Sequence, residues 1–220
     1  MTPTFFNWFY AWRVKGPLAR RFTEIYRKNL FGGGESISGP GSDLVQTEEI
    51  RRLLPDLFNR YAIASILDAA CGDFFWMKHV CLDDLSYIGV DVVAPMIALN
   101  ANRYGGGKVE FRLLDVTTQP VPRVDLILCR DLLVHLDYSA AKRAIANFRA
   151  SGSAYLLTTT FPAHDNAQLD GIWRPLNLQA EPFNFPPPLE LINENCSENE
   201  GIYRDKSLGL WRLQELPAGG

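Results

Sequence analysis

The stretch from Ser65 to Trp76 constrains the fold more than any other part of the chain. A short apolar run ends in Asp68, tightens through the small residues 69–72 and then takes on a helical pattern. This order is typical of a buried β-strand and a tight turn, where backbone amides can approach a cofactor closely. A second apolar run ends in Asp91, 23 residues after Asp68. Because an acidic residue at the tip of the second strand binds a ribose in nucleotide-binding sheets, the pair predicts an adenosyl cofactor.

Short apolar runs alternate with amphipathic runs over the rest of the chain. This alternation predicts an α/β fold with a doubly wound, mostly parallel, seven-stranded sheet. The expected strands lie at 64–69, 86–91, 108–114, 124–129, 154–160, 189–195 and 207–213. The helices expected between them lie at 74–80, 93–103 and 138–150.

The two flanking regions differ from this core. Aromatic residues at helical spacing before Pro17, an amphipathic run from Leu18 to Leu30 and another from Thr47 to Tyr61 predict a helical extension over residues 1–60. Residues 61–220 then form the core. Within it, the segment 161–188 is rich in Pro and Asn and is too long for a plain connection, so we expect it to pack and to bind substrate.

Composition excludes several classes of function. The net charge is −3 and no basic stripe stands out beyond an interrupted run near the N-terminus, so no nucleic-acid partner is expected. No apolar run is long enough to insert into a membrane. The four cysteines have neither zinc-type spacing nor close pairing, so we expect no metal and a reducing, cytoplasmic location. The oligomeric state is left open.

Asp68 also discriminates between cofactors. A nicotinamide-binding fold places a glycine-rich turn here so that a pyrophosphate can lie against the helix N-terminus. This chain has a carboxylate at the strand end, which repels phosphates, and Gly72 is the single glycine of the turn. A cofactor with a cationic amine and a sulfonium, and without phosphate, suits the site better. The sequence therefore predicts S-adenosyl-L-methionine.

The motifs resemble those of class I S-adenosylmethionine-dependent methyltransferases over about residues 60–160. Asp68-Ala-Ala-Cys-Gly-Asp73 is similar to the first motif of that family, and Val124–Leu136 is similar to the fourth. The run Asp68-x-x-Cys-Gly-Asp-x-x-Trp-Met, with Trp173–Asn177 and Asp205–Trp211, further resembles a small bacterial-type subgroup. The chain departs from the first motif at Ala70 and Phe74, where glycines are commoner. Phe74 therefore suggests an altered helix entry and an aromatic wall for the pocket.

The resemblance implies a role for each cofactor residue. It assigns Asp91 to the ribose hydroxyls and Asp115 to the adenine amino group, with Val92 and Val116 flanking the adenine ring. The complete expected set is Asp68, Ala70, Cys71, Gly72, Asp91, Val92, Asp115, Val116 and Arg130.

Each acidic residue also has a structural alternative. Asp68 can cap the helix that follows, Asp91 can cap the helix over 93–103, and Asp115 can be a turn residue.

Catalytic candidates cluster after the fourth expected strand. His135 has the intrinsic pKa of a general base, although a histidine here can equally fix the loop by hydrogen bonding. Asp131 can orient that histidine or accept the proton itself. Arg130 can bind the carboxylate of the cofactor or brace the loop. His164, just after the fifth strand, is a second candidate base.

Two further segments are expected near the substrates. The loop Ser36–Ser42 offers hydroxyls and amides that suit the methionine end of the cofactor, with Trp12 or Trp76 nearby; a plain linker is the alternative. Polar groups mixed with aromatic planes suit a sugar-like acceptor, and a carboxylated small molecule nearly as well. The expected substrate-binding residues are Trp76, Asn166, Trp173, Arg174 and Asn184.

These features predict an enzyme that transfers a methyl group from S-adenosylmethionine to a small molecule or glycan, with a sugar-like hydroxyl as the expected acceptor. Methylation of a carboxylate or amine of a small metabolite is the alternative. A nicotinamide-dependent oxidoreductase is disfavoured by the missing glycines. A protein that binds the cofactor without turnover stays open.

Overall fold

The computed structural model describes residues 16–217 and contains one seven-stranded sheet in the order β3-β2-β1-β4-β5-β7-β6. β7 runs antiparallel to β5 and β6, and the other neighbours are parallel. This confirms the predicted fold class. The strands are β1 (Ser65–Ala69), β2 (Ser86–Asp91), β3 (Val109–Leu113), β4 (Leu126–Cys129), β5 (Tyr155–Thr160), β6 (Glu190–Asn193) and β7 (Ser207–Arg212).

The strand order reverses direction between β1 and β4. From β1 the chain proceeds outward through β2 to β3, then returns to the other side of β1 to form β4. The central strands are almost entirely buried, as their continuous apolar sequences require when helices cover both faces. At such a reversal the connections after β1 and β4 diverge to opposite faces, which leaves a crevice at the carboxyl ends of the strands.

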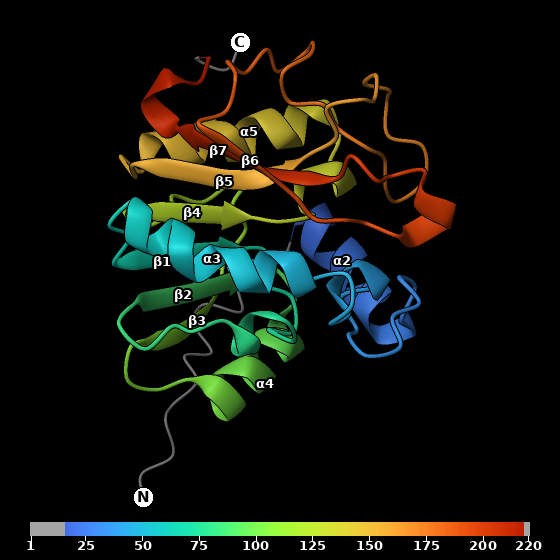
Figure 1. The fold of residues 1–220 in the computed structure, drawn as a ribbon. Coiled ribbons are helices and arrows are strands. Elements are labelled where there is room, and N and C mark those ends of the chain that lie inside the picture. The colour runs from blue at the N-terminus through green and yellow to red at the C-terminus, as the bar shows by residue number, and fades with distance from the viewer. Residues whose placement is uncertain (1–15, 218–220) are drawn as a thin grey trace, which may run out of the picture.

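Helices cover the two faces of the sheet (Figure 1). Buried side chains of α3 (Glu48–Arg60) and α4 (Ala94–Tyr104) share one apolar core with one face. Those of α5 (Tyr138–Ala150) share a second core with the other face. All three helices occur where the sequence predicts them, because their apolar residues recur at helical spacing.

The helix predicted at 74–80 is wrong. The chain forms only a short 3-10 turn there, Met77–His79. Phe74 has a positive φ of 59°, which a continuing helix does not tolerate. Its ring is buried against Tyr87, Tyr104 and Phe111 at centroid distances of 5.1–5.3 Å. The aromatic residue that replaces the usual glycine thus anchors the turn in the core.

Two further regions lie near the carboxyl ends of the strands. α2 (Pro17–Lys28), in the N-terminal extension, lies beside that edge (Figure 1). The segment 161–188 contains no helix or strand. It nevertheless buries five side chains in the core shared with α5, which confirms that it packs: Phe161, Leu176, Leu178, Phe183 and Phe185. The aromatic residues before Pro17, Trp12 included, lie outside the described residues.

Within residues 16–217, no helix is both long and apolar enough to cross a membrane. The same part of the chain holds no group of three or more His, Cys, Asp or Glu side chains arranged for a metal ion. A cytoplasmic location stays a prediction.

Candidate functional site

A cavity opens at the carboxyl ends of β1, β2, β3 and β4, where the strand order reverses; we call it the strand-end cavity. α2 and the loop that follows it cover the cavity with Leu18, Phe22, Tyr26, Phe31, Ile37 and Ser38. The residues that the sequence assigns to the cofactor all line it: Asp68, Ala70, Cys71, Gly72, Asp91, Val92, Asp115, Val116 and Arg130. The nine residues therefore lie together around one cavity, and their assignment to the cofactor stays a prediction.

Asp68 lies at the end of β1 and is 3% exposed. Its carboxylate accepts a hydrogen bond of 2.6 Å from the hydroxyl of Tyr87. Burial raises the pKa of Asp68 to about 7, although the hydrogen bond from Tyr87 acts in the opposite direction. No described helix begins directly after β1, so Asp68 does not cap one.

Asp91 lies at the end of β2 and uses both carboxylate oxygens. Oδ1 accepts from the amide of Val93 at 3.0 Å, and Oδ2 accepts from the amide of Gly72 at 3.3 Å. Burial raises the pKa of Asp91 to about 6 against these hydrogen bonds. Asp91 thus holds Val93, the residue before α4, and the turn after β1 while it faces the cavity, and it does not cap α4 itself.

Asp115 follows β3 and has the turn role that the sequence left open. Its Oδ1 accepts from the amide and the hydroxyl of Thr117 at 2.9 and 2.6 Å. The amide of Asp115 itself donates to the side chain of Gln119 at 2.8 Å. Asp115 also lines the cavity, so its structural role is compatible with ligand binding.

The strand-end cavity is strongly acidic. Among its described lining residues, the carboxylates are Asp68, Asp73, Asp91, Asp115 and Asp131, whereas Arg130 is the one residue with a permanent positive charge. The Arg130 guanidinium already contacts Glu194 and the carbonyl of Gly41. Such a cavity disfavours phosphates and favours a cationic ligand.

Asp73 holds the loop that covers the cavity, a role that sequence reasoning missed. Its carboxylate accepts from the hydroxyls of Ser36 and Ser38 at 2.9 and 3.1 Å and from the amide of Ile37 at 3.0 Å. The amide of Ser38 is used as well, because it donates to Ser36 Oγ at 3.1 Å. The amides of Ile37 and Ser38 are therefore engaged within the protein and are not free to bind the methionine end of the cofactor.

Gly72 is required where this loop approaches the turn. Its φ is +55°, and a Cβ added there would lie 2.3 Å from Ser38 Oγ. The carbonyl of Gly72 accepts from the buried amide side chain of Asn100 at 2.8 Å. Asn100 lies on α4, and no feature of the sequence distinguishes it from the exposed Asn102 of the same helix.

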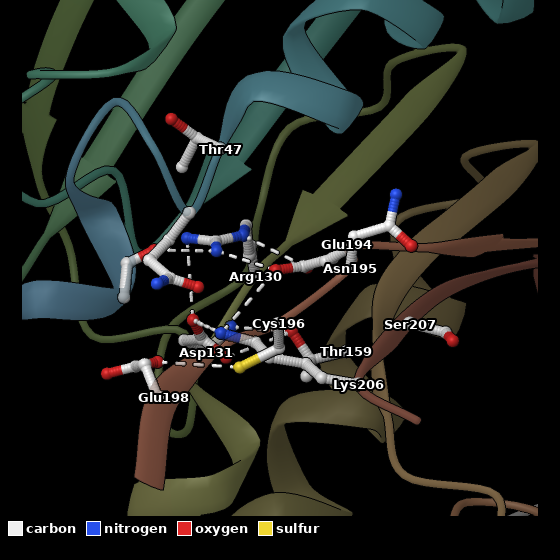
Figure 2. Close-up of polar contacts among 12 residues, drawn as sticks. Thr47, Arg130, Asp131, Thr159, Glu194, Asn195, Cys196, Glu198, Lys206 and Ser207 are labelled. Carbon is white, nitrogen blue, oxygen red and sulfur yellow. Dashed lines mark hydrogen bonds and ion pairs between the residues drawn. The ribbon is translucent and has the colours of Figure 1, made fainter. Parts of the chain in front are cut away.

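Four charged side chains meet at one side of the cavity, and all of them except the half-buried Asp131 are buried (Figure 2). Arg130 makes two hydrogen bonds to Glu194, at 3.1 and 2.7 Å, and its guanidinium lies 5.4 Å from the ring of Trp76. Lys206 contacts Asp131 at 2.6 Å and lies 3.5 Å from Glu194. The two positive and two negative groups neutralise one another, which buried charges require.

Asp131 is a poor proton acceptor in this arrangement. Burial raises its pKa, but the Lys206 ammonium and the Arg130 guanidinium outweigh burial and hold the pKa below its ordinary value. Its backbone has a positive φ of 56°, and its amide donates to the hydroxyl of Thr159 at 2.9 Å. No hydrogen bond joins Asp131 to His135 among the described residues, so Asp131 does not orient the histidine by direct contact.

A second cavity adjoins the first, and we call it the loop cavity. It is lined by segments far apart in the sequence: the loop 31–42, the end of β4, the segment after β5 and the connection between β6 and β7. Five residues line both cavities and mark where they meet: Phe31, Ser38, Ser42, Asp131 and His135. Trp173 lines the loop cavity, and Trp76 lines the strand-end cavity.

His135 lies at the junction of the two cavities. Its Nδ1 is 2.5 Å from the carbonyl oxygen of Ile172. A carbonyl can only accept, so Nδ1 carries the proton and Nε2 has the free lone pair. Burial lowers the pKa of His135, although the Ile172 carbonyl opposes this, and the ring is therefore neutral near pH 7. No described residue hydrogen-bonds to Nε2.

Four other candidates line neither cavity among the residues described. His164 bonds to Asp205 at 3.1 Å and packs against Tyr203. The side chain of Asn166 joins two parts of the segment 161–188 through hydrogen bonds to Asn177 and to the carbonyl of Glu181. Arg174 is buried, donates to the carbonyl of Leu136 and lies 4.7 Å over the ring of Tyr138. Asn184 is exposed and has a positive φ of 50°.

The contacts of His164, Asn166 and Arg174 thus hold the loops around the loop cavity and do not form its surface. Phe74 likewise lines neither cavity, because its ring is part of the core.

Comparison with known proteins adds an independent observation. Residues 66–151 match the family model described as a methyltransferase domain. The match covers less than half of the chain, but it contains β1 to α5 and most of the strand-end cavity. It supports the prediction of a methyltransferase enzyme. No curated protein sequence matches the chain.

One solved structure supports the fold. The chain is similar to 1,6-didemethyltoxoflavin-N1-methyltransferase from Burkholderia thailandensis, with 19% identity over 96% of this chain and 92% of that chain and a TM-score of 0.59. A TehB-like SAM-dependent methyltransferase from Corynebacterium glutamicum has 16% identity over 68% and 76% of the two chains, with a TM-score of 0.46. For three other solved structures the match spans only 43–58% of the length of the solved chain.

Proposed function

We propose that this protein transfers a methyl group from S-adenosylmethionine to a small-molecule or glycan acceptor. One observation carries the proposal: a cavity at the strand-order reversal that is lined by five carboxylates and by no free cation among the described residues. The methyltransferase-domain match over residues 66–151 supports it. The Burkholderia structure with the TM-score of 0.59 was solved with bound S-adenosylhomocysteine and 1,6-didemethyltoxoflavin, which accords with this cofactor and with a small acceptor.

The residues of the strand-end cavity fit the cofactor. Acceptor oxygens of Asp91 and Asp115 suit ribose hydroxyls and the adenine amino group, and Val92 and Val116 supply apolar surface for a flat ring. Gly72 lets the loop that carries Ser38 lie close to the turn after β1, since a Cβ at Gly72 would meet Ser38. When bound, S-adenosylmethionine supplies a methyl group on a sulfonium, which leaves with the electron pair of its bond to sulfur retained by the sulfur.

We place the acceptor in the loop cavity and propose that its reacting group is a sugar-like hydroxyl. His135 lies where the two cavities meet, with a neutral ring and a free Nε2 lone pair. Nε2 accepts the hydroxyl proton as the new carbon–oxygen bond forms, so that a methyl ether and S-adenosylhomocysteine result. A positioned base of this kind contributes roughly 10²–10⁴-fold to the rate.

The loop 31–42 and α2 act as the lid over both substrates in this proposal. Asp73 holds the loop from below through Ser36, Ile37 and Ser38. Arg130 holds its other end through the carbonyl of Gly41 at 2.7 Å. A lid excludes water from the reacting groups and so strengthens the electrostatic interactions inside.

Turnover of a panel of acceptors tests the proposal. The full chain is incubated with S-adenosylmethionine and a panel of sugars and hydroxy acids, and products are identified by mass spectrometry. The expected result is a mass gain of one methyl group on a hydroxyl of one class of acceptor, with stoichiometric S-adenosylhomocysteine. Methylation only at a carboxylate or amine would contradict the hydroxyl assignment. Binding of the cofactor without any methylated product would favour a binding protein instead.

A further inference from the structure

The walls of the loop cavity are aromatic. Phe161, Trp173 and Tyr203 come from different segments and pack edge to face, with centroid distances of 4.8–5.9 Å and interplanar angles of 69–83°. Phe31 of the lid contributes to the same cavity, where its ring lies 4.8 Å from that of His135. Aromatic walls of this kind bind the apolar face of a ring, whether an aromatic ring or the C–H face of a sugar.

The charged groups of this cavity are unequal in number. Its described lining contains the carboxylates of Asp131 and Glu198 and the single ammonium of Lys206. Lys206 is already paired with Asp131 at 2.6 Å. Behind the cavity, Arg130 and Glu194 neutralise each other. One carboxylate is therefore in excess.

Glu198 is that carboxylate. It lies in the connection between β6 and β7, half-buried, and its Oε2 accepts only from the thiol of Cys196, at 3.8 Å (Figure 2). It forms no ion pair with any described residue. The same Oε2 would lie 3.3 Å from a Cβ added at Gly41, so the carboxylate faces the lid backbone.

We propose that the acceptor is a ring compound that carries a protonated amino group, and that Glu198 recognises this group. The inference rests on the proposed function, because it concerns the acceptor of the same reaction. A cation beside Glu198 is attracted, and the aromatic walls add to this attraction. An anionic acceptor meets a group of charges in which one carboxylate is in excess, so carboxylated and phosphorylated acceptors are disfavoured.

Two series of matched compounds test this inference. The sugar series is glucosamine, methyl glucoside and glucuronate; the aromatic series is tyramine, 4-ethylphenol and 4-hydroxyphenylacetate. Dissociation constants are measured by ligand-observed NMR on the full chain saturated with S-adenosylhomocysteine, at about pH 6.5, where the amines are protonated and the carboxylates ionised. The series that binds identifies the kind of ring.

Within that series, we expect the ammonium compound to bind at least about tenfold more tightly than the carboxylate compound, with the neutral compound between them. Glu198→Gln should reduce this preference to about twofold or less, because the amide keeps the shape and removes the charge. Glu200→Gln is the matched control. Glu200 is an exposed acidic residue two positions away that does not line either cavity, so its variant should keep the wild-type preference.

The outcomes separate this inference from the proposed function. If S-adenosylhomocysteine fails to bind, the proposed function itself is contradicted. If it binds but the carboxylate compounds bind as well as the ammonium compounds, or neither ammonium compound binds, the inference about the acceptor is overturned. The same holds if Glu198→Gln leaves the preference unchanged.

Discussion

The two cavities are built in different ways. The strand-end cavity is lined by residues that directly follow four consecutive strands, and its shape depends on backbone positions such as Gly72. The loop cavity is lined by side chains from four separate connections, and its surface is aromatic. In the proposed function, the sheet thus fixes the position of the cofactor, whereas the loops determine which acceptor binds. Substitutions in the two regions should therefore separate cofactor binding from acceptor chemistry.

The largest effect is expected at the junction of the two cavities. His135→Gln should lower kcat by roughly 10²–10⁴-fold because it removes the proton acceptor. The dissociation constant of S-adenosylhomocysteine should change by no more than about twofold. Steady-state kinetics and calorimetry measure the two quantities. His164→Gln is the control, since His164 lines neither described cavity and should retain nearly full activity. Equal losses in both variants would mean that His135 only supports the structure.

A smaller effect, on cofactor binding alone, is expected at Gly72. Gly72→Ala places a Cβ in a left-handed conformation and 2.3 Å from Ser38 Oγ. Strain and the displaced lid should weaken S-adenosylmethionine binding by about 10- to 100-fold, measured by calorimetry.

The control for Gly72 is Gly152→Ala. Gly152 has a φ of +71° with only Arg123 nearby, at 4.0 Å. The control should lose stability from the same backbone strain and keep its affinity for the cofactor. A normal affinity in Gly72→Ala would show that the turn does not need glycine for cofactor binding.

Loss of the contacts between Asp73 and the lid should have a moderate effect on cofactor binding. Asp73→Asn removes a charged acceptor from Ser36, Ile37 and Ser38, and charge-assisted hydrogen bonds are each worth about 1.5–3 kcal/mol. We expect about tenfold weaker cofactor binding and faster proteolysis within residues 31–42. Asp56→Asn, an exposed position on α3, provides the comparison. Unchanged proteolysis would mean that Asp73 does not hold the lid.

The smallest effect is a pH dependence. The pKa of Asp68 is about 7 and that of Asp91 about 6, both raised by burial. A cationic ligand favours their ionised forms, so affinity for S-adenosylmethionine should rise several-fold between about pH 5.5 and 8. Asp68→Asn should remove the part of this rise near pH 7 and leave the part near pH 6. A flat profile in the wild-type protein would contradict the account.

Without ligand, the same shift of Asp68 acts on stability in the opposite sense. A pKa raised in the folded state stabilises the protein below the ordinary pKa of an aspartate, and this contribution is lost as the pH rises through about 7. Thermal unfolding of the free protein at several pH values measures it, with Asp68→Asn for comparison.

The sequence predicted the strand-end cavity well because its residues follow directly from strand ends. Asp68, Asp91 and Asp115 each end or follow an apolar run, and parallel strands bring such ends together at one edge of the sheet. The sequence failed at the helix expected over 74–80, because the positive φ of Phe74 is not visible in a hydrophobic pattern.

The contacts of the lid and of the loop cavity could not be predicted in the same way. Asp73 pairs with residues 35–37 positions away, and Arg130 pairs with Glu194 across 64 positions. No periodicity specifies such partners, since they depend on how the connections fold over the sheet. For the same reason the polar residues Asn166 and Arg174 were expected in a substrate site, whereas the structure uses them to hold the loops.

Calorimetric titration of the full chain with S-adenosylmethionine and, separately, with NAD tests the central claim most directly. The carboxylate-rich cavity predicts binding of one molecule of S-adenosylmethionine per chain and no binding of NAD, whose pyrophosphate the cavity repels. Binding of NAD, or a failure of S-adenosylmethionine to bind, would contradict the assignment of the strand-end cavity to this cofactor.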